Sequence, residues 1–256
     1  MIAKTIIAIL VLLASYVGFL AANAPAAWVI AQAQPQLEAA KATLSDVRGS
    51  AWNGSAELGL RDEDLGRLHW QASFWPLITG HLNADVSVQG SELKLSGHIA
   101  GAGQTLQLSH VKGEAALPVL ARLAGLPGGL SGTLTADLDK VAFKQQALQS
   151  AQGNLVAHGV GVPDLGVSLG TLTLNLYDSG SGVQGKLANS GGDLELAGTL
   201  SLITSGIYVL RATLKPRGNS AKSNQIRDAL AAVLGAPDSS GHYHYNATGH
   251  LNLGAR

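Results

Sequence analysis

The sequence predicts a mainly β protein: an N-terminal transmembrane helix, then a long, curved antiparallel β-sheet or sandwich with two short amphipathic helices. Three observations lead to this prediction. The chain opens with an uncharged apolar segment, and short stretches of alternating apolar and polar residues fill most of the remainder. Glycine-rich turns separate these stretches, and two helical stretches interrupt the alternation.

The N-terminal segment has the length and the flanks of a membrane anchor. No charged residue lies between Lys4 and Glu38, and residues 6–22 are almost wholly apolar. A helix that crosses a bilayer needs roughly 20 such residues. Because the next basic residue is Lys41, the positive-inside rule puts the N-terminus in the cytoplasm and the bulk of the chain in the periplasm. The residues predicted to face lipid are Ile6, Ile7, Ile9, Leu10, Leu12, Leu13, Val17, Phe19 and Leu20.

A cleaved signal peptide is the alternative. Ala22 and Ala24 have the small-x-small form of a cleavage site, but Pro25 follows directly and the apolar run is long for a signal. Either alternative exports most of the chain. The predicted organisation is an anchor over residues 1–30, a helical linker over 31–43 and a periplasmic β-domain over 44–256.

The β-domain is predicted from period-two alternation. Residues 82–88, 172–176 and 208–214 alternate apolar with polar side chains, so each strand has one apolar and one polar face. Residues 178–182 and 189–193 have the composition of hairpin turns. Strands at this spacing, joined by such turns, indicate an antiparallel sheet.

Helical spacing appears twice, over residues 114–124 and 224–234, and in both places glycine and then proline follow. Each predicted helix precedes a glycine-rich turn and another alternating strand. This repetition predicts two similar halves, residues 44–149 and 150–256.

Composition excludes several classes of function. The 17 basic and 17 acidic side chains balance, so we expect no nucleic-acid partner. There is no cysteine, which rules out disulfides, thiolate metal sites and cysteine nucleophiles. Because no nucleophile elbow, P-loop or dinucleotide fingerprint is present, we predict no enzyme, no catalytic residue, no cofactor and no small-molecule substrate.

The chain's tryptophan, glycine and proline motifs carry a family resemblance. A Val-x-Gly-x-x-Trp-x-Gly element over residues 47–54 precedes two further tryptophans, and a glycine-tyrosine strand lies near the C-terminus. The motif residues, read as core or docking positions, are Gly49, Trp52, Gly54, Trp70, Trp75, Pro76, Gly206, Tyr208 and Pro216. In order and spacing these motifs resemble the type II secretion system protein N family, also called general secretion pathway protein N.

This resemblance implies a bitopic inner-membrane protein that is an accessory part of the machine exporting folded periplasmic proteins through an outer-membrane secretin. It implies the inner membrane, the platform proteins C, L and M, and the secretin D as partners. The mechanism we expect is protein–protein contact, since an unpaired sheet edge can pair with a partner strand.

The alternative function is a periplasmic lipid-binding or lipid-bridging β-groove. It requires an apolar concave face that no helix covers. The residues expected to line this face include Leu82, Val86, Leu106, Leu134 and Leu174.

Three groups of side chains have a structural and a functional interpretation. Trp52, Trp70 and Trp75 are expected to pack in the core rather than to dock a partner, because indoles bury a large area. His242 and His244 are expected on one strand face, but no third ligand can be named, so no metal is predicted. The acidic stretch over residues 61–64 is expected to be a solvated hairpin turn.

Overall fold

The structure is a computed structural model that describes residues 24–124, 129–145, 147–180 and 182–250. The residues predicted to form the membrane-spanning core of the anchor all lie within residues 1–23, outside the described ranges, whereas residues 24–30, the end of the predicted anchor segment, are described. In the part of the chain that is described, no helix is long and apolar enough to cross a bilayer. The anchor, its orientation and its cleavage therefore stay predictions.

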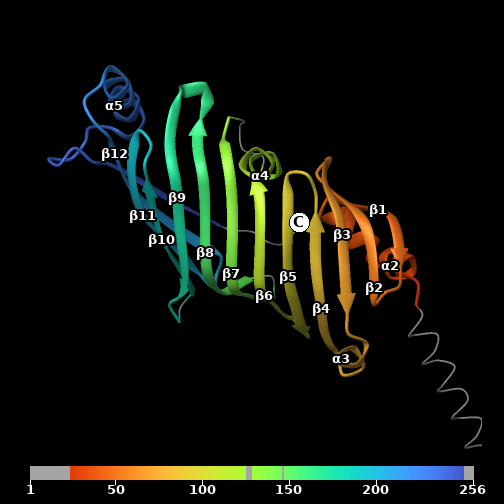
Figure 1. The fold of residues 1–256 in the computed structure, drawn as a ribbon. Helices are drawn as coiled ribbons and strands as arrows, with labels where there is room; N and C mark the ends of the chain where they lie inside the picture. The colour runs from red at the N-terminus through yellow and green to blue at the C-terminus, as the bar shows by residue number, and fades with distance from the viewer. Residues whose placement is uncertain (1–23, 125–128, 146, 181, 251–256) are drawn as a thin grey trace, which may run out of the picture.

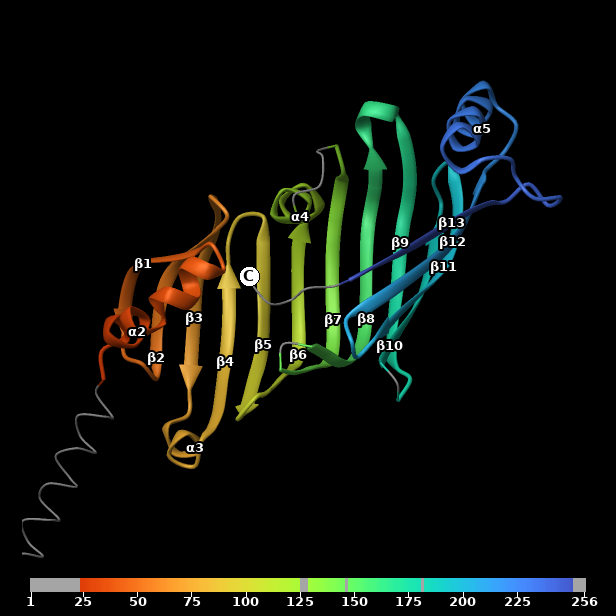
Figure 2. The same cartoon turned by 180° about the vertical axis from the view of Figure 1, so that it is seen from behind.

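The described strands form one thirteen-stranded sheet in which each strand pairs with the next along the chain (Figures 1 and 2). Every pairing is antiparallel. The sequence left an open sheet and a sandwich as alternatives, and the structure is the open sheet. The strands are β1 (Ala42–Gly49), β2 (Asn53–Leu60), β3 (Glu63–Ala72), β4 (His81–Gln89), β5 (Leu93–Ala102), β6 (Thr105–Ala116), β7 (Ser131–Lys144), β8 (Ala147–Val162), β9 (Val167–Asp178), β10 (Gly182–Ser190), β11 (Leu194–Ile203), β12 (Ile207–Pro216) and β13 (Tyr243–His250).

Helices flank the sheet at its β1 end and along both rims, with α3 at the bottom and α4 and α5 at the top of the view (Figure 1). They are α2 (Ala26–Ala39), α3 (Phe74–Ile78), α4 (Leu117–Ala124), α5 (Ala221–Leu234) and the 3-10 turn η1 (Pro163–Leu165). The predicted linker helix thus begins at Ala26 and ends at Ala39, and the sheet begins at Ala42 rather than at residue 44.

Both predicted amphipathic helices end where expected, at Ala124 and Leu234, but their first residues differ. The first helix begins at Leu117, because Glu114 still pairs with Lys94 in the β5–β6 ladder. The second begins earlier, at Ala221, because the Ser220 hydroxyl accepts a hydrogen bond from the Ser223 N–H at 3.2 Å and caps the helix.

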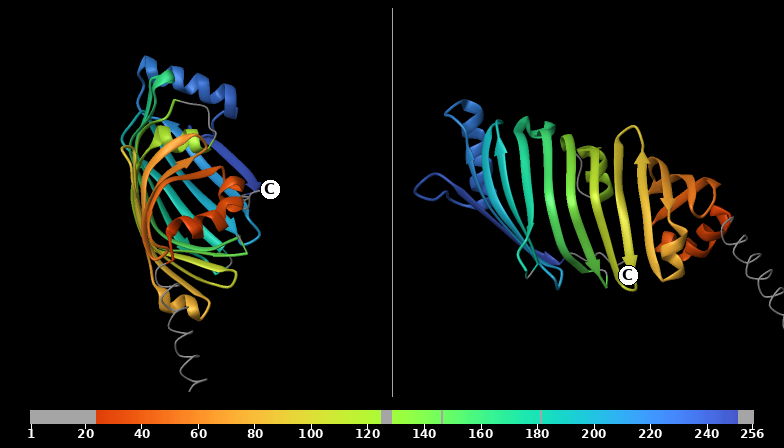
Figure 3. Two further views of the ribbon diagram at one scale, coloured as in Figure 1. Left: turned by 90° about the vertical axis from the view of Figure 1, so that its right-hand side faces the viewer. Right: turned by 60° about the horizontal axis from the view of Figure 1, so that its bottom comes forward.

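The sheet is strongly curved and encloses a trough, with α2 and α4 on its hollow side (Figure 3). Strand twist and bulges produce this curvature. Register shifts interrupt five of the ladders, among them β7–β8 and β8–β9 near the middle of the sheet. At one end of the trough the strands approach closely enough for Val141 of β7 to join a cluster with Leu202 of β11.

The arrangement of helices has a period of six strands, since α4 follows β6 and α5 follows β12. Residues 149 and 150, the predicted boundary between halves, both lie inside β8, where the sheet continues without a break. The division into two similar halves stays a prediction.

The core is thin. Among the described residues, no large side chain has less than 2% of its surface exposed. A single layer cannot cover its own apolar face, so burial is confined to the places where helices or curvature bring a second layer. Much of one sheet face therefore stays accessible.

Candidate functional site

The first feature is a continuous apolar face. Side chains alternate along a strand, and the register places apolar residues side by side across the sheet. Trp70 lies opposite Val86, which lies opposite Gly97. Far along the sheet, Leu174 lies opposite Leu187. Helix α4 packs on this face and occupies the hollow side, so the trough is lined by hydrocarbon (Figure 3).

The apolar face is covered only in places. Val119 of α4 is 3% exposed and packs against Leu65 and Val88. Between the helices, Leu82, Leu95 and Leu106 are each 38–40% exposed. The middle of the trough is thus open.

The five residues expected to line a lipid groove all lie on this face. They are Leu82, Val86, Leu106, Leu134 and Leu174, and none of them is buried. The expectation that no helix covers the face is wrong where α4 lies over Val88. The apolar side of this helix is buried against the sheet there. A lipid function itself stays a prediction.

Beneath α5 the apolar face narrows to a groove of about 700 Å3. Its walls are β9–β12, one end of β8, Tyr245 of β13 and one side of α5. The lining residues are Val162, Val167, Leu169, Leu187, Leu194, Leu196, Leu210, Ala212, Leu214, Lys222, Gln225, Ile226, Ala229, Leu230, Val233, Leu234 and Tyr245. No local sequence pattern indicates this groove, because its lining is drawn from seven elements spread between Val162 and Tyr245.

The first half of α5 is tied to the sheet. The Ser223 hydroxyl donates to the Arg217 carbonyl at 2.7 Å, and the Tyr243 hydroxyl donates to the Arg227 carbonyl at 3.2 Å. Ile226 is buried, whereas Val233, near the end of the helix, is 81% exposed. The second half therefore overhangs the groove.

Lys222 is the charged side chain of the groove lining. Its ammonium lies 2.6 Å from Asp193 Oδ2, which also accepts the Ser168 N–H at 2.7 Å. The hydrogen bond from Lys222, followed by the one from Ser168, lowers the pKa of Asp193 below its ordinary value. An ammonium has three donors, and Asp193 occupies one of them.

The tryptophans occupy three different environments. Trp70 is half-buried and packs on the bare backbone of Gly54, while its indole N–H donates to the Ser50 carbonyl at 3.3 Å. Trp52 is half-buried with its ring 5.0 Å from that of Phe74. Trp75 is 79% exposed, so the expectation that it packs in the core is wrong for this residue, and its docking role stays a prediction.

The other motif residues shape turns and strand ends. Gly49 and Gly206 have φ values of +86° and +84°, which favour glycine. Pro76 lies in α3 and its carbonyl accepts the Thr79 hydroxyl at 2.8 Å. Tyr208 packs against Gly249, and Pro216 is buried where β12 ends.

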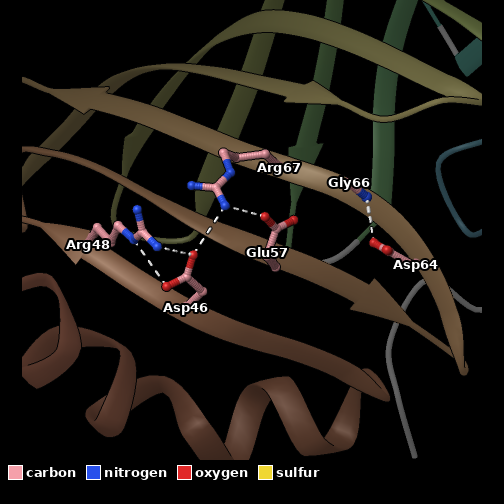
Figure 4. Close-up of polar contacts among 6 residues, drawn as sticks. All are labelled: Asp46, Arg48, Glu57, Asp64, Gly66 and Arg67. Carbon is pink, nitrogen blue, oxygen red and sulfur yellow. Dashed lines mark hydrogen bonds and ion pairs between the residues drawn. The ribbon is translucent and has the colours of Figure 1, made fainter.

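An ion-pair network stabilises the first three strands on the polar face (Figure 4). Asp46 has a φ of +49° in a bulge of β1, and its carboxylate contacts Arg48 at 2.9 Å and Arg67 at 3.1 Å. Arg67 also pairs with Glu57. Hydrogen bonding to Arg48, with a smaller contribution from Arg67, lowers the pKa of Asp46.

The predicted acidic turn over residues 61–64 is shorter than expected: Arg61 and Asp62 form the turn between β2 and β3, while Glu63 and Asp64 already lie in β3. It also has a contact that was not expected: Arg122 of α4 donates to both Glu63 oxygens, at 2.7 and 2.9 Å. Its partner is 59 residues away in the chain, so no local pattern predicts this pairing.

The histidines do not assemble a metal centre in the described ranges, where no group of three or more histidine or acidic side chains could hold an ion. His98 pairs with Asp85 at 2.8 Å. His242 precedes β13 rather than lying in it, so it does not share a strand face with His244 as expected. Asp238 accepts from the His242 N–H at 2.9 Å and contacts the His244 ring at 3.0 Å.

The second feature is the contrast between the two sheet edges. At the β1 edge, α2 packs against the strand, a bulge interrupts its ladder, and the Ala51 N–H donates to the Ala24 carbonyl at 2.8 Å. At the other edge, β13 pairs with β12 without a bulge and contains neither proline nor lysine. Such devices normally block edge pairing, so in the part of the chain that the structure describes β13 is the unprotected edge.

The protein therefore belongs to the class of open, single-layer antiparallel sheets that have an apolar trough and one unprotected edge. Residues 40–246 match the family described as type II secretion system (T2SS), protein N. The chain belongs to this family, which confirms the resemblance in the sequence motifs and a role in type II secretion. No curated protein and no solved structure matches the chain significantly.

Proposed function

We propose that the chain is an accessory inner-membrane component of the type II secretion system that supports export of folded periplasmic proteins by protein–protein contacts. The unprotected edge of β13 is the observation that carries this proposal. A strand that adds to this edge gains a ladder of main-chain hydrogen bonds, with specificity from neighbouring side chains.

The β13 edge lies at the opposite end of the sheet from Ala24, the first described residue. Pro25 pairs with Ser50 at the β1 end of the sheet, so an anchor within residues 1–23 joins the domain there. Twelve strand spacings of about 4.8 Å separate β1 from β13 by roughly 58 Å along the curved sheet. Trp28 of α2 is 62% exposed at the β1 end, and an exposed indole there is compatible with the proposed position beside a membrane interface.

The platform proteins C, L and M and the secretin D are the partners we propose. A membrane-attached domain that projects its free edge into the periplasm can reach the periplasmic parts of such subunits. The segment before Ala24 is proposed to span the inner membrane once, with the described domain in the periplasm.

Photo-cross-linking tests this proposal. A photoreactive amino acid replaces Thr248, which is exposed on β13, in the full chain expressed in cells that contain the secretion system. The control position is Asp137, which is exposed on β7 in the interior of the sheet. We expect Thr248 to capture a platform subunit or the secretin and Asp137 to capture neither. Equal capture from both positions, or none from Thr248, would overturn the edge-pairing proposal.

A further inference from the structure

The groove beneath α5 points to a ligand of definite chemistry. Apart from Lys222, Gln225 and the Tyr245 hydroxyl, every lining side chain is hydrocarbon. We propose that this groove binds one acyl chain of an anionic lipid, with the headgroup beside Lys222. This site goes beyond the proposed role in assembly, which depends on a different feature of the domain, its edge.

The backbone of the groove excludes an extended peptide as the occupant. Strands β9 to β12 are interior strands whose ladders are paired on both sides. A peptide strand lying on their faces would find no partners for its amides and carbonyls, and burying those groups unpaired is costly. A hydrocarbon chain has no such groups.

The size of the groove favours an acyl chain over a helix. A helix with its side chains is roughly 10–12 Å across, so two turns of it occupy about 850 Å3 or more. The groove has about 700 Å3, which falls within the range of sites for single small ligands. One acyl chain fits, and each methylene that it buries contributes about 0.8 kcal/mol of transfer free energy.

Charge complementarity selects the headgroup. Lys222 is the charged group of the lining, and its side chain is 47% exposed, which leaves it accessible beside Asp193. An anionic headgroup can therefore share the ammonium with Asp193. A cationic headgroup would face the ammonium directly and be repelled.

The second half of α5, which overhangs the groove, would cover a bound acyl chain. Val233 is 81% exposed and Ala229 is also exposed, although both line the groove. A bound acyl chain would supply the apolar surface that these side chains lack. Ligand binding is thus expected to protect the second half of α5 from solvent.

Photolabelling with a diazirine-bearing palmitic acid tests the proposal. Cells that express the full chain incorporate this fatty acid into their lipids, and irradiation is followed by mass spectrometry of the labelled peptides. We expect labelled peptides from β10 to β12 and from α5. The mass of the adduct distinguishes a membrane phospholipid from a free fatty acid. Label confined to the predicted anchor, or adducts of zwitterionic lipid alone, would overturn the proposal.

Matched variants make the result specific to the groove. Ala229→Trp fills the groove and Val233→Glu puts a charge in it, and because both sites are exposed neither change should unfold the domain. Ala232→Glu adds the same charge at an exposed residue of α5 outside the lining. We expect at least a fivefold loss of groove label in the first two variants and no loss in the third. Unchanged label in both groove variants would rule out the site, whatever the outcome of cross-linking at β13.

Lys222→Gln tests the headgroup separately. We expect this variant to retain acyl label but to lose its preference for anionic adducts over zwitterionic ones. An unchanged preference would contradict the role of Lys222.

Discussion

The indole of Trp70 lies directly on the backbone of Gly54, where a Cβ atom on the glycine would come within 2.3 Å of the indole Cζ2 atom. Both residues belong to the motifs that mark the family. Tyr208 and Gly249 repeat the arrangement at the other end of the sheet, where a Cβ atom on Gly249 would come within 2.7 Å of the Tyr208 ring. In a thin domain, a large ring on a bare backbone provides burial that a second layer would otherwise provide.

Gly54→Ala should therefore destabilise the sheet. The added methyl group displaces the Trp70 ring and strains its hydrogen bond to Ser50, at a cost of roughly 2 kcal/mol. Urea unfolding followed by tryptophan fluorescence measures the change. Gly101→Ala is the control, since its Cβ would meet neighbours at 3.5 Å, an ordinary contact distance. Equal midpoints for the two variants would contradict the packing argument.

Val119 should hold α4 on the trough. The Val119 side chain is only 3% exposed and packs against Leu65 and Val88. Val119→Ala removes its two methyl groups and should lower the free energy of unfolding by roughly 2 kcal/mol. Glu63→Gln, which weakens the solvent-accessible pair with Arg122, should cost less than the loss of the buried Val119 methyl groups. Hydrogen exchange of the α4 amides compares the two. A larger effect from Glu63→Gln would show that charge, rather than burial, positions this helix.

Adjacent proline substitutions in β13 should separate edge pairing from folding. Neighbouring residues on an edge strand point their N–H groups in opposite directions, so Asn246→Pro and Ala247→Pro differ in which ladder they interrupt. One variant should keep the sheet intact while it removes an outward N–H. We expect that variant to retain its circular dichroism but to lose secretion of exported proteins in cells. Normal secretion by both variants would argue against a partner strand at this edge.

The stability that Asp238 gives to the start of β13 and to the segment before it should be lost only in strong acid. Hydrogen bonds from the His242 and Ser240 N–H groups and the His244 ring lower the pKa of Asp238 to about 2 from an ordinary 3.8. Because the folded-state pKa is depressed, the stabilisation is fully present above about pH 4 and is lost as the pH falls through 2.

Hydrogen exchange of β13 at decreasing pH, corrected for the intrinsic rate, tests this prediction. Asp238→Asn imitates the protonated carboxyl and should exchange faster than the wild type at pH 7. The difference should stay constant down to about pH 4 and vanish near pH 2. A difference that disappears already at pH 5 would point to a group other than Asp238.

Local sequence predicted the parts of the fold whose physics is local. The alternation over residues 172–176 identified β9 and its apolar face, and the composition of residues 189–193 identified the turn after β10. The glycine after Leu234 marked the end of α5. Glu114 was predicted to lie in a helix although it lies in β6, because its pairing with Lys94 extends β6 to Ala116, and local periodicity does not show how far a strand stays paired.

The candidate site depends on contacts between residues that are far apart in the sequence, and no local sequence pattern predicts such contacts. Lys222 and Asp193 meet because α5 folds back over β11, and Arg122 reaches Glu63 although β4, β5 and β6 separate them in the chain. The unprotected edge likewise follows from strand order, since only the completed sheet shows which strand has a single neighbour.

By itself the sequence determined that this protein is an antiparallel sheet with one apolar and one polar face, because side-chain alternation is a property of each strand alone. Whether the sheet closes into a sandwich or stays an open trough was decided by the tertiary structure. Twist and bulges accumulate over thirteen strands, and only their sum sets the curvature that leaves the apolar face and the β13 edge accessible.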